Sequence, residues 1–276
     1  MEKIRLIIGM VLLICVSGIG MAQKEDSETL TVPLSNPGKT YTLKVKLLSG
    51  DINVTGYDGN EIVINATPGA EEDEEVNDRS ETKGMKKISA GGGFEITAKE
   101  ADNIITVNNG SLGRNIRLDI RVPQNGKLRL GTVNEGVVSV KNIKGEIEVD
   151  NVNDDIELEN ISGSAVANTI SGEVIVSFST VDPGASMAFS TLSGDINVTF
   201  PESVKANFKL KSDMGDVFSD FDIDIDKNQA KTEKTTEPGL YKIKKDNWVS
   251  GKVNGGGPEI MFKSMSGDIY IRKAKK

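Results

Sequence analysis

The chain has 276 residues, a formal net charge of −8, no histidine and a single cysteine, Cys15. The absence of histidine excludes Ser-His-Asp and Cys-His nucleophile arrangements, and zinc sites built from histidine and cysteine. The acidic balance disfavours nucleic acid and anionic bilayer surfaces as partners, because both carry negative charge.

Residues 1–22 have the composition of a secretory signal peptide. Two positive residues, Lys3 and Arg5, precede the apolar run Leu6–Ser17. Gly20 and Ala22 then occupy the positions that a signal peptidase reads, directly before residue 23. A retained membrane anchor is the alternative, since the apolar run is nearly long enough to span a bilayer. Cleavage is favoured because small residues end the run.

Cys15 does not predict a lipid anchor, because Ile14 stands where a bacterial lipobox has a small residue. Cleavage leaves residues 23–276 without cysteine and without a second apolar run, so we expect no disulfide and no membrane span. We therefore expect an exported protein that resides in the periplasm, on the cell surface or outside the cell.

Residues 23–276 are predicted to form one all-β domain. Apolar and polar residues alternate in most of this region, as in Tyr41–Leu47 and Ile116–Val122, which is strand periodicity. Two segments break the pattern and are predicted to be inserted surface loops, at about residues 67–93 and 227–238. The first loop contains the acidic run Glu71–Glu75. We interpret that run as a solvated insertion rather than a cation-binding tip.

The segment Ile143–Phe178 divides without a gap into four nine-residue units, IKGEIEVDN, VNDDIELEN, ISGSAVANT and ISGEVIVSF. A related phrase, LSGDINV, occurs at residues 48–54 and 192–198, and MSGDIYI closes the chain at residues 265–271. A fixed short period of strand-like units is typical of stacked repeat folds. In each unit the apolar residues of the strand share one side, which only a neighbouring unit can cover.

Nine residues allow one short strand and one corner, so two units would make a flattened coil of eighteen residues. Unit n then stacks on unit n+2, and we predict a single-stranded parallel β-helix, or β-solenoid, with a right-handed coil. An antiparallel sandwich is the competing fold. It is disfavoured because the units repeat the same residue at the same place and lack the Asn-Gly and Asp-Gly corners of tight hairpins.

Three stretches of the chain resemble the DUF4097 adhesin family and the related head GIN domain proteins. They are the run IRLDIRVPQNGKLRLGTVNEGVVSVKNIKGEIEVDNVNDDIELENISG, the copies of LSGDINV and the closing NGGGPEIMFKSMSGDIYI. The resemblance covers residues 43–271. It implies a β-helix on the outside of bacteria. It brings no catalytic residues, and the acidic loop after Pro68 looks like a local addition to the family pattern.

Carboxylates are the first group of side chains to weigh as a site, because glycosidases use paired acids. Glu146, Glu148, Glu157 and Glu159 form outward pairs on neighbouring units. Such rows are usually solvated faces that keep strands from aggregating. No cluster of lysine and arginine marks a polysaccharide lyase.

The segment Ser219–Asp226 is the best metal candidate, because four aspartates alternate with apolar residues. On a straight strand neighbouring carboxylates lie ~6.6 Å apart, and calcium prefers six to eight oxygens from a curved loop. We therefore predict an amphipathic strand with a wet face. The Ser-Gly-Asp phrase is predicted to be a corner and not a nucleophile elbow, because no base accompanies it.

The sequence thus predicts a non-enzymatic, adhesin-like binding protein or cell-envelope scaffold without a catalytic, metal or cofactor site. Its partner would be a surface protein or a glycan. The alternative is a carbohydrate-active β-helix enzyme, either a polysaccharide lyase or a glycosidase.

Overall fold

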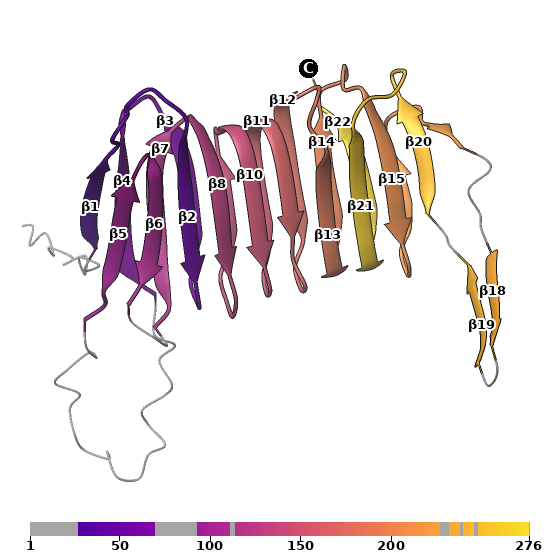
Figure 1. Ribbon diagram of the computed structural model, residues 1–276, viewed down its shortest axis with the longest axis horizontal. Coiled ribbons are helices and arrows are strands. Elements are labelled where there is room, and N and C mark those ends of the chain that lie inside the picture. The colour runs from indigo at the N-terminus through magenta and orange to yellow at the C-terminus, as the bar shows by residue number, and fades with distance from the viewer. Residues whose placement is uncertain are drawn as a thin grey trace, which may run out of the picture.

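The protein is an elongated all-β molecule in a computed structural model that describes residues 27–69, 93–110, 114–226, 232–237, 240–245 and 248–275 (Figure 1). The predicted signal peptide and the acidic run Glu71–Glu75 lie outside these residues. Within them, no helix has the length and apolar character needed to cross a membrane. The strands are β1 Glu28–Pro33, β2 Tyr41–Leu47, β3 Ile52–Tyr57, β4 Glu61–Pro68, β5 Ile96–Ala101, β6 Ile104–Asn109, β7 Ile116–Pro123, β8 Asn125–Thr132, β9 Val138–Lys141, β10 Lys144–Asn151, β11 Ile156–Asn168, β12 Val174–Val181, β13 Met187–Ser193, β14 Ile196–Phe200, β15 Ala206–Ser212, β16 Val217–Ser219, β17 Asp224–Ile225, β18 Thr232–Glu237, β19 Leu240–Lys245, β20 Val249–Val253, β21 Glu259–Ser266 and β22 Ile269–Lys273.

Twenty of these strands form one sheet that folds back on itself into two faces, joined through β11. Residues 156–159 of β11 pair with β9, and residues 156–158 and 161–163 pair with β12. Residues 162–168 pair with β10, and residues 166–168 also pair with β13. We call the face with strand order β5-β6-β2-β8-β10-β11-β13-β21-β15-β20-β17 the β10 face. We call the face with order β1-β4-β7-β3-β9-β11-β12-β14-β22-β16 the β12 face.

The central strands stack in parallel with a repeat of eighteen residues. Ile147 lies beside Ala165, and Ile156 lies beside Val174, each pair separated by two nine-residue units. The expected stacking of unit n on unit n+2 is therefore confirmed for these coils. The division into one strand and one corner per unit is wrong at β11, which continues through the corner at Asn160 and Ile161.

Two coils are not stacked in the order of the sequence. The coil of β2 and β3 lies between the coil of β6 and β7 and the coil of β8 and β9. Likewise the last coil, β21 and β22, lies between β13–β14 and β15–β16 (Figure 1). Coils that carry the same sequence phrase align residue by residue when their strands pair. A coil can therefore pair with a coil from a distant part of the chain.

Antiparallel strands lie at both ends of the stack. At one end β1 pairs antiparallel with β4, β4 with β7, and β5 with β6. At the other end β20 pairs antiparallel with both β15 and β17. The predicted surface loops also contain strand residues. Thr67 and Pro68 belong to β4, and residues 232–237 form β18, which makes an antiparallel hairpin with β19. These residues of the two predicted loops therefore have strand structure.

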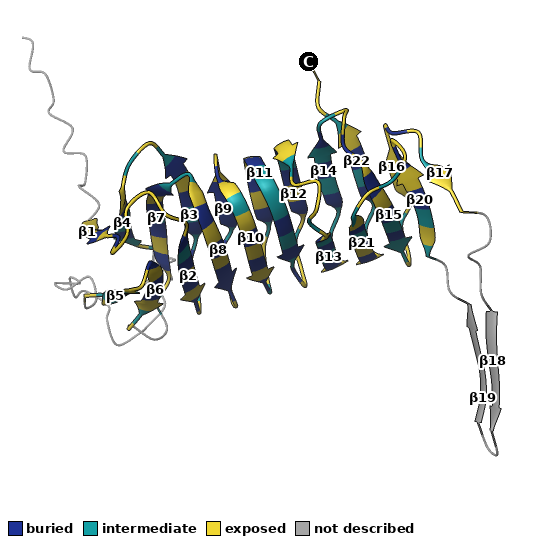
Figure 2. Cartoon of the chain, turned by 45° about the horizontal axis from the view of Figure 1, so that its top comes forward, coloured by how far each residue is buried: buried dark blue, intermediate teal, exposed yellow. Residues whose placement is uncertain are grey.

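The core lies between the two faces and consists of the inward residues of each strand, seen as dark blue bands in Figure 2. It is mostly aliphatic toward the N-terminus. In the other half, rings pack against one another, with Phe178 stacked on Phe200 at 5.2 Å and Phe189 beside Phe262 at 5.4 Å. Burial of each such side chain stabilises the fold by about 1.5–3 kcal/mol, and only the neighbouring coils supply that burial.

Candidate binding surface

Glycines form a row at the corner that leads from the β10 face to the β12 face. We call it the Gly-Asp corner. Gly172, Gly194 and Gly267 lie on successive coils and have φ values of +150°, +145° and +148°. A Cβ on Gly194 would lie 2.0 Å from the carbonyl oxygen of Gly172, and one on Gly267 would lie 1.9 Å from that of Gly194. Only glycine combines this conformation with so close an approach. The predicted corner at the Ser-Gly-Asp phrase is thus confirmed.

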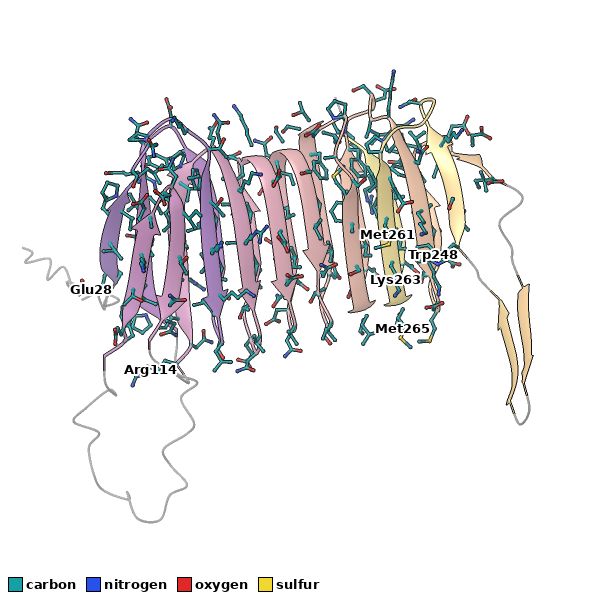
Figure 3. The ribbon with its side chains drawn as sticks, viewed as in Figure 1. Glu28, Arg114, Trp248, Met261, Lys263 and Met265 are labelled. Atoms are coloured by element: carbon teal, nitrogen blue, oxygen red, sulfur yellow. The ribbon has the colours of Figure 1, made fainter. Side chains whose placement is uncertain are left out.

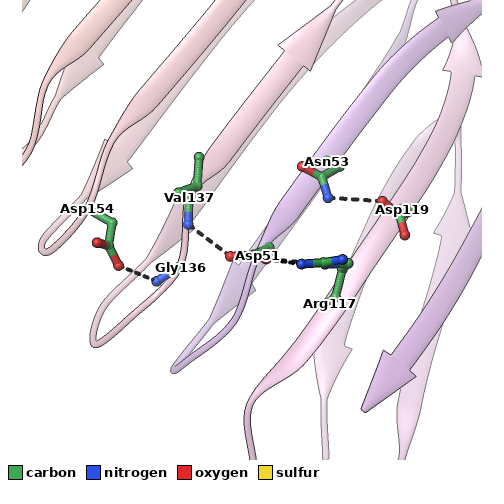
Figure 4. Close-up of polar contacts among 7 residues, drawn as sticks. All are labelled: Asp51, Asn53, Arg117, Asp119, Gly136, Val137 and Asp154. Carbon is green, nitrogen blue, oxygen red and sulfur yellow. Dashed lines mark hydrogen bonds and ion pairs between the residues drawn. The ribbon is translucent and has the colours of Figure 1, made fainter. Parts of the chain in front are cut away.

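The aspartates that follow Gly194 and Gly267 link one coil to the next. The Asp195 Oδ1 accepts a hydrogen bond from the backbone N–H of Asp268 at 2.7 Å, and the Asp268 Oδ1 accepts one from the N–H of Asp216 at 2.8 Å. Near the N-terminus, Asp51 binds the N–H of Val137 and forms an ion pair with Arg117 at 3.2 Å (Figure 4). These carboxylates therefore satisfy corner amides and are structural groups.

A row of buried polar side chains lies just before the same corner. Thr191 donates to the carbonyl of Gly172 at 3.0 Å, Thr169 to that of Asp154 at 3.2 Å, and Ser264 to that of Gly194 at 3.3 Å. Asn151 takes the same role toward Gly136. Sequence reasoning did not detect this row. Its signal is a polar residue at an inward position of the strand, two residues before the Ser or Asn of the corner.

The four glutamates considered as a catalytic set lie on opposite faces. Glu146 and Glu148 extend from β10, whereas Glu157 and Glu159 extend from the part of β11 that belongs to the β12 face. Three of them form ion pairs with a lysine or arginine on the adjacent strand of the sheet. These pairs are Lys127–Glu146 at 2.9 Å, Arg129–Glu148 at 3.3 Å and Lys141–Glu159 at 2.7 Å. The two pairs cannot converge on one glycosidic bond.

The expected amphipathic strand at residues 219–226 is wrong. The chain leaves the sheet after Ser219 and pairs again only at β17, where Asp224 lies beside Lys252. Phe221 is buried, and the Asp220 carboxylate accepts a hydrogen bond from the N–H of Lys273. In the described part of the chain, no three carboxylate, cysteine or histidine side chains are grouped to hold a metal ion.

Two aromatic rings form a platform at the end of the β12 face. Phe218 on β16 and Tyr270 on β22 are stacked, with ring centroids 5.3 Å apart and planes inclined by 12°. Phe218 is 48% exposed. Arg272 lies over the Tyr270 ring at 5.4 Å, and its Nε donates to Asn197 at 3.0 Å. The rings, the guanidinium and the amide are thus held in fixed positions on a flat surface.

A shallow depression of about 300 Å³ lies on the β10 face beside Gly131. Lys44, Lys46 and Arg129 line it on one side, and Glu148 and Asp150 on the other. Arg129 is already paired with Glu148, and Asp150 accepts a hydrogen bond from Asn168 at 3.0 Å. The depression is therefore a mixed-charge surface and not a deep cleft.

The ionisable groups with perturbed pKa values have structural causes. The hydrogen bond from Tyr270 to Asp268 raises the pKa of the tyrosine, and the hydrogen bond to Glu159 raises that of Lys141. Hydrogen bonds from Ser35 lower the pKa of Glu100. Burial raises the pKa of Tyr41, whose hydroxyl donates to the carbonyl of Pro123 at 2.7 Å. None of these groups belongs to a set with the geometry of a general acid and base.

Stacked coils, glycine corners and flat outward faces define the chain as a β-solenoid-like repeat protein. It belongs to the Toastrack DUF4097 family, whose model matches residues 13–272. The family predicted from the repeated phrases is therefore confirmed. No curated protein matches the sequence significantly.

Two solved structures are similar to this chain. One is a candidate cell adhesion protein from Clostridium sporogenes, at 13% identity, which covers 90% of this chain and 99% of its own with a TM-score of 0.44. The other is a candidate adhesin from Bacteroides fragilis, at 10% identity, which covers 91% of this chain and 98% of its own with a TM-score of 0.29.

Proposed function

We propose that this protein is an exported, non-enzymatic binding protein of adhesin type, and that its partner is a glycan or a protein on a cell surface. The observation that carries this proposal is the aromatic platform on the β12 face, formed by exposed Phe218 and half-buried Tyr270. A single apolar residue on a surface is ordinary, but here two stacked rings lie beside a fixed guanidinium and amide, which is the composition of a binding patch with polar groups at its rim.

The platform suits a sugar ring better than an extended apolar ligand. A sugar has an apolar C–H face that packs on an aromatic ring, and hydroxyls at its rim that need polar partners. Arg272 and Asn197 provide such partners beside Tyr270, and their mutual hydrogen bond holds them in place before binding. A site that is ordered in advance loses less entropy when a ligand binds.

A non-enzymatic role is favoured because the four outward glutamates weighed as catalytic acids do not converge on one site. The outward glutamates of β10 and β11 lie on opposite faces, and most are paired with lysine or arginine. A lyase or glycosidase would need a base or two acids on one side of a bound chain. The acidic net charge also disfavours nucleic acid as a partner.

A glycan array probed with the full-length chain, produced in a host that can process residues 1–22, tests the proposal. Replacement of Phe218→Ser should reduce binding to the recognised glycan at least tenfold. Ile175→Ser is the matched control, because Ile175 is also an exposed apolar residue of the β12 face, on β12. Equal loss in both variants, or release of shortened sugar from any bound polysaccharide, would contradict the proposal.

The coil geometry is part of the same proposal. We propose that the central coils wind as one right-handed, single-stranded parallel helix, because crossovers between parallel strands nearly always turn in that direction. The parallel pairing of β8, β10 and β11 supports it. An experimentally phased density map reads the direction of the coil directly.

A further inference from the structure

A row of aliphatic side chains, six of them exposed, runs along the Gly-Asp corner, one on each of seven successive coils. Among the described residues, thirteen large hydrophobic side chains are exposed, and six of them belong to this row. We call it the apolar corner row. In the order of the stacked coils its members are Leu48, Val133, Val152, Ile170, Leu192, Met265 and Met214.

Hydrogen bonds between coils hold the row in register. The N–H of Ile170 binds the carbonyl of Val152 at 3.2 Å, and the N–H of Ser193 binds the carbonyl of Ile170 at 2.8 Å. The row is thus as straight as the stack itself, with a rise of ~4.8 Å for each coil. In Figure 3, Met265 marks the edge of the molecule along which the row lies.

The fold does not need these side chains to be apolar. At this corner the inward position is already occupied by the polar row that includes Asn151, Thr169 and Thr191, so the next aliphatic residue points to solvent. Six of its members are 44–69% exposed. A single exposed aliphatic residue is ordinary, whereas the same exposure on successive coils requires an explanation.

We infer that the apolar corner row is a self-association surface, and that its partner is the same row of a second copy of this chain. A rigid row with one aliphatic side chain every ~4.8 Å is matched along its whole length only by a surface of the same spacing. The second copy supplies that surface when the two rows run in opposite directions about a two-fold axis.

The area of the row is sufficient for a weak dimer. Half-exposed side chains on six coils leave roughly 500 Å² of apolar surface, near the upper end for patches on monomers. Two such rows, together with their flanks, bury roughly 1,200 Å², which is the lower bound for a specific interface. The residue directly after each member is uncharged, and the carboxylates of the Gly-Asp corner lie two or three residues further along the chain; the uncharged residues are Ser49, Asn134, Asn153, Ser171, Ser193, Ser266 and Gly215.

The opposite direction of the two rows predicts which residues meet across the dimer. Ile170 is the central member of the row, so in an antiparallel dimer it lies opposite its own copy, whereas Leu48 lies opposite Met214. In a chain carrying Cys15→Ser, Ile170→Cys should therefore form a disulfide-linked dimer on mild oxidation. Leu48→Cys alone should not, but a mixture of Leu48→Cys and Met214→Cys chains should.

Sedimentation velocity of the full-length chain, again from a host able to process residues 1–22, tests the association itself. We expect reversible dimers at tens of micromolar protein, as suits so small an interface. The triple variant Val133→Thr, Ile170→Thr, Leu192→Thr should weaken dimerisation by roughly 100-fold, because each copy loses three apolar contacts. The matched control is Leu30→Thr, Ile104→Thr, Ile175→Thr, which changes residues of similar exposure outside the row and should dimerise normally.

Circular dichroism separates a lost interface from a lost fold, since both triple variants should keep the β spectrum. A wild-type chain that stays monomeric throughout, or dimers that persist in the row variant, would overturn the inference. So would a monomer that floats with neutral phosphatidylcholine vesicles only while the row is intact, because the occupant would then be lipid.

Discussion

Ile161 and Ile170 occupy the same place in the nine-residue repeat, yet Ile161 is 1% exposed and Ile170 is 47% exposed. The reason is that the two corners of each coil differ. At Ile161 the strand β11 runs through the corner and the side chain packs into the core. At Ile170 the polar Thr169 fills the inward position, and the aliphatic side chain turns outward. The true structural repeat is eighteen residues.

This difference should appear directly in stability. Ile161→Ala should lower the free energy of unfolding by about 2–5 kcal/mol, because it leaves a cavity in the core. Ile170→Ala should change it by no more than about 0.5 kcal/mol, as expected at an exposed site. Urea unfolding at low protein concentration, where association does not contribute, measures both. Similar losses in the two variants would show that the corners are equivalent.

The buried polar row should contribute through its hydrogen bonds. Thr191→Val keeps the shape of the side chain but leaves the carbonyl of Gly172 without the donor that binds it at 3.0 Å. We expect a loss of about 1–3 kcal/mol, the cost of an unsatisfied buried acceptor. Thr199→Val is the control, since Thr199 lies outward on β14 and should tolerate the change. Thermal unfolding followed by circular dichroism compares the two.

The glycine row should be intolerant of any side chain. Gly194→Ala places a Cβ 2.0 Å from the carbonyl oxygen of Gly172 at a φ of +145°, so the coils must separate locally. We expect at least about 3 kcal/mol of destabilisation. Gly184→Ala serves as the comparison, because its nearest neighbour would be 3.6 Å away. Soluble yield and urea midpoint give the readout, and a well-folded Gly194→Ala protein would contradict the corner geometry.

Tyr41 should make the fold sensitive to alkali. Burial raises its pKa, so the folded state keeps the phenol protonated while the unfolded chain ionises near pH 10. Its contribution is complete below pH 10 and is lost as pH rises further, by up to about 1.4 kcal/mol for each pH unit.

Tyr41→Phe removes this titration together with the hydrogen bond to Pro123. The variant should be less stable than wild type at pH 7, by about 1 kcal/mol, and the difference should shrink or reverse above pH 11. Urea unfolding from pH 7 to pH 11.5 measures the trend. A constant difference across that range would mean that the phenol titrates alike in both states.

Alternation of apolar and polar residues was enough to predict an all-β repeat fold. A short strand with one apolar side can bury that side only in a few arrangements of neighbouring strands. The in-register repeat of Ile147 on Ala165 followed from the same pattern. The positive φ of the Gly-Asp corner followed from the Ser-Gly-Asp phrase, since glycine alone adopts it without strain. The family also followed from these phrases.

Other features depended on contacts that a local pattern does not encode. The four glutamates look alike along the chain, but their strands lie on opposite faces because the corner between β10 and β11, at residues 152–155, separates the two pairs. The aspartates of residues 219–226 alternate like a strand, yet burial of Phe221 turns that segment away from the sheet. The pairing of Phe218 with Tyr270 joins residues far apart in sequence.

The amino-acid sequence alone determined that the chain stacks short strands, where its glycine corners lie and that it has no histidine for catalysis. Only the tertiary structure decided which coil lies beside which, since coils with the same phrase fit one another equally well in register. It also decided which aliphatic residues are buried. At the Gly-Asp corner the inward position is filled by Asn151, Thr169 or Thr191, and the apolar corner row is left in solvent.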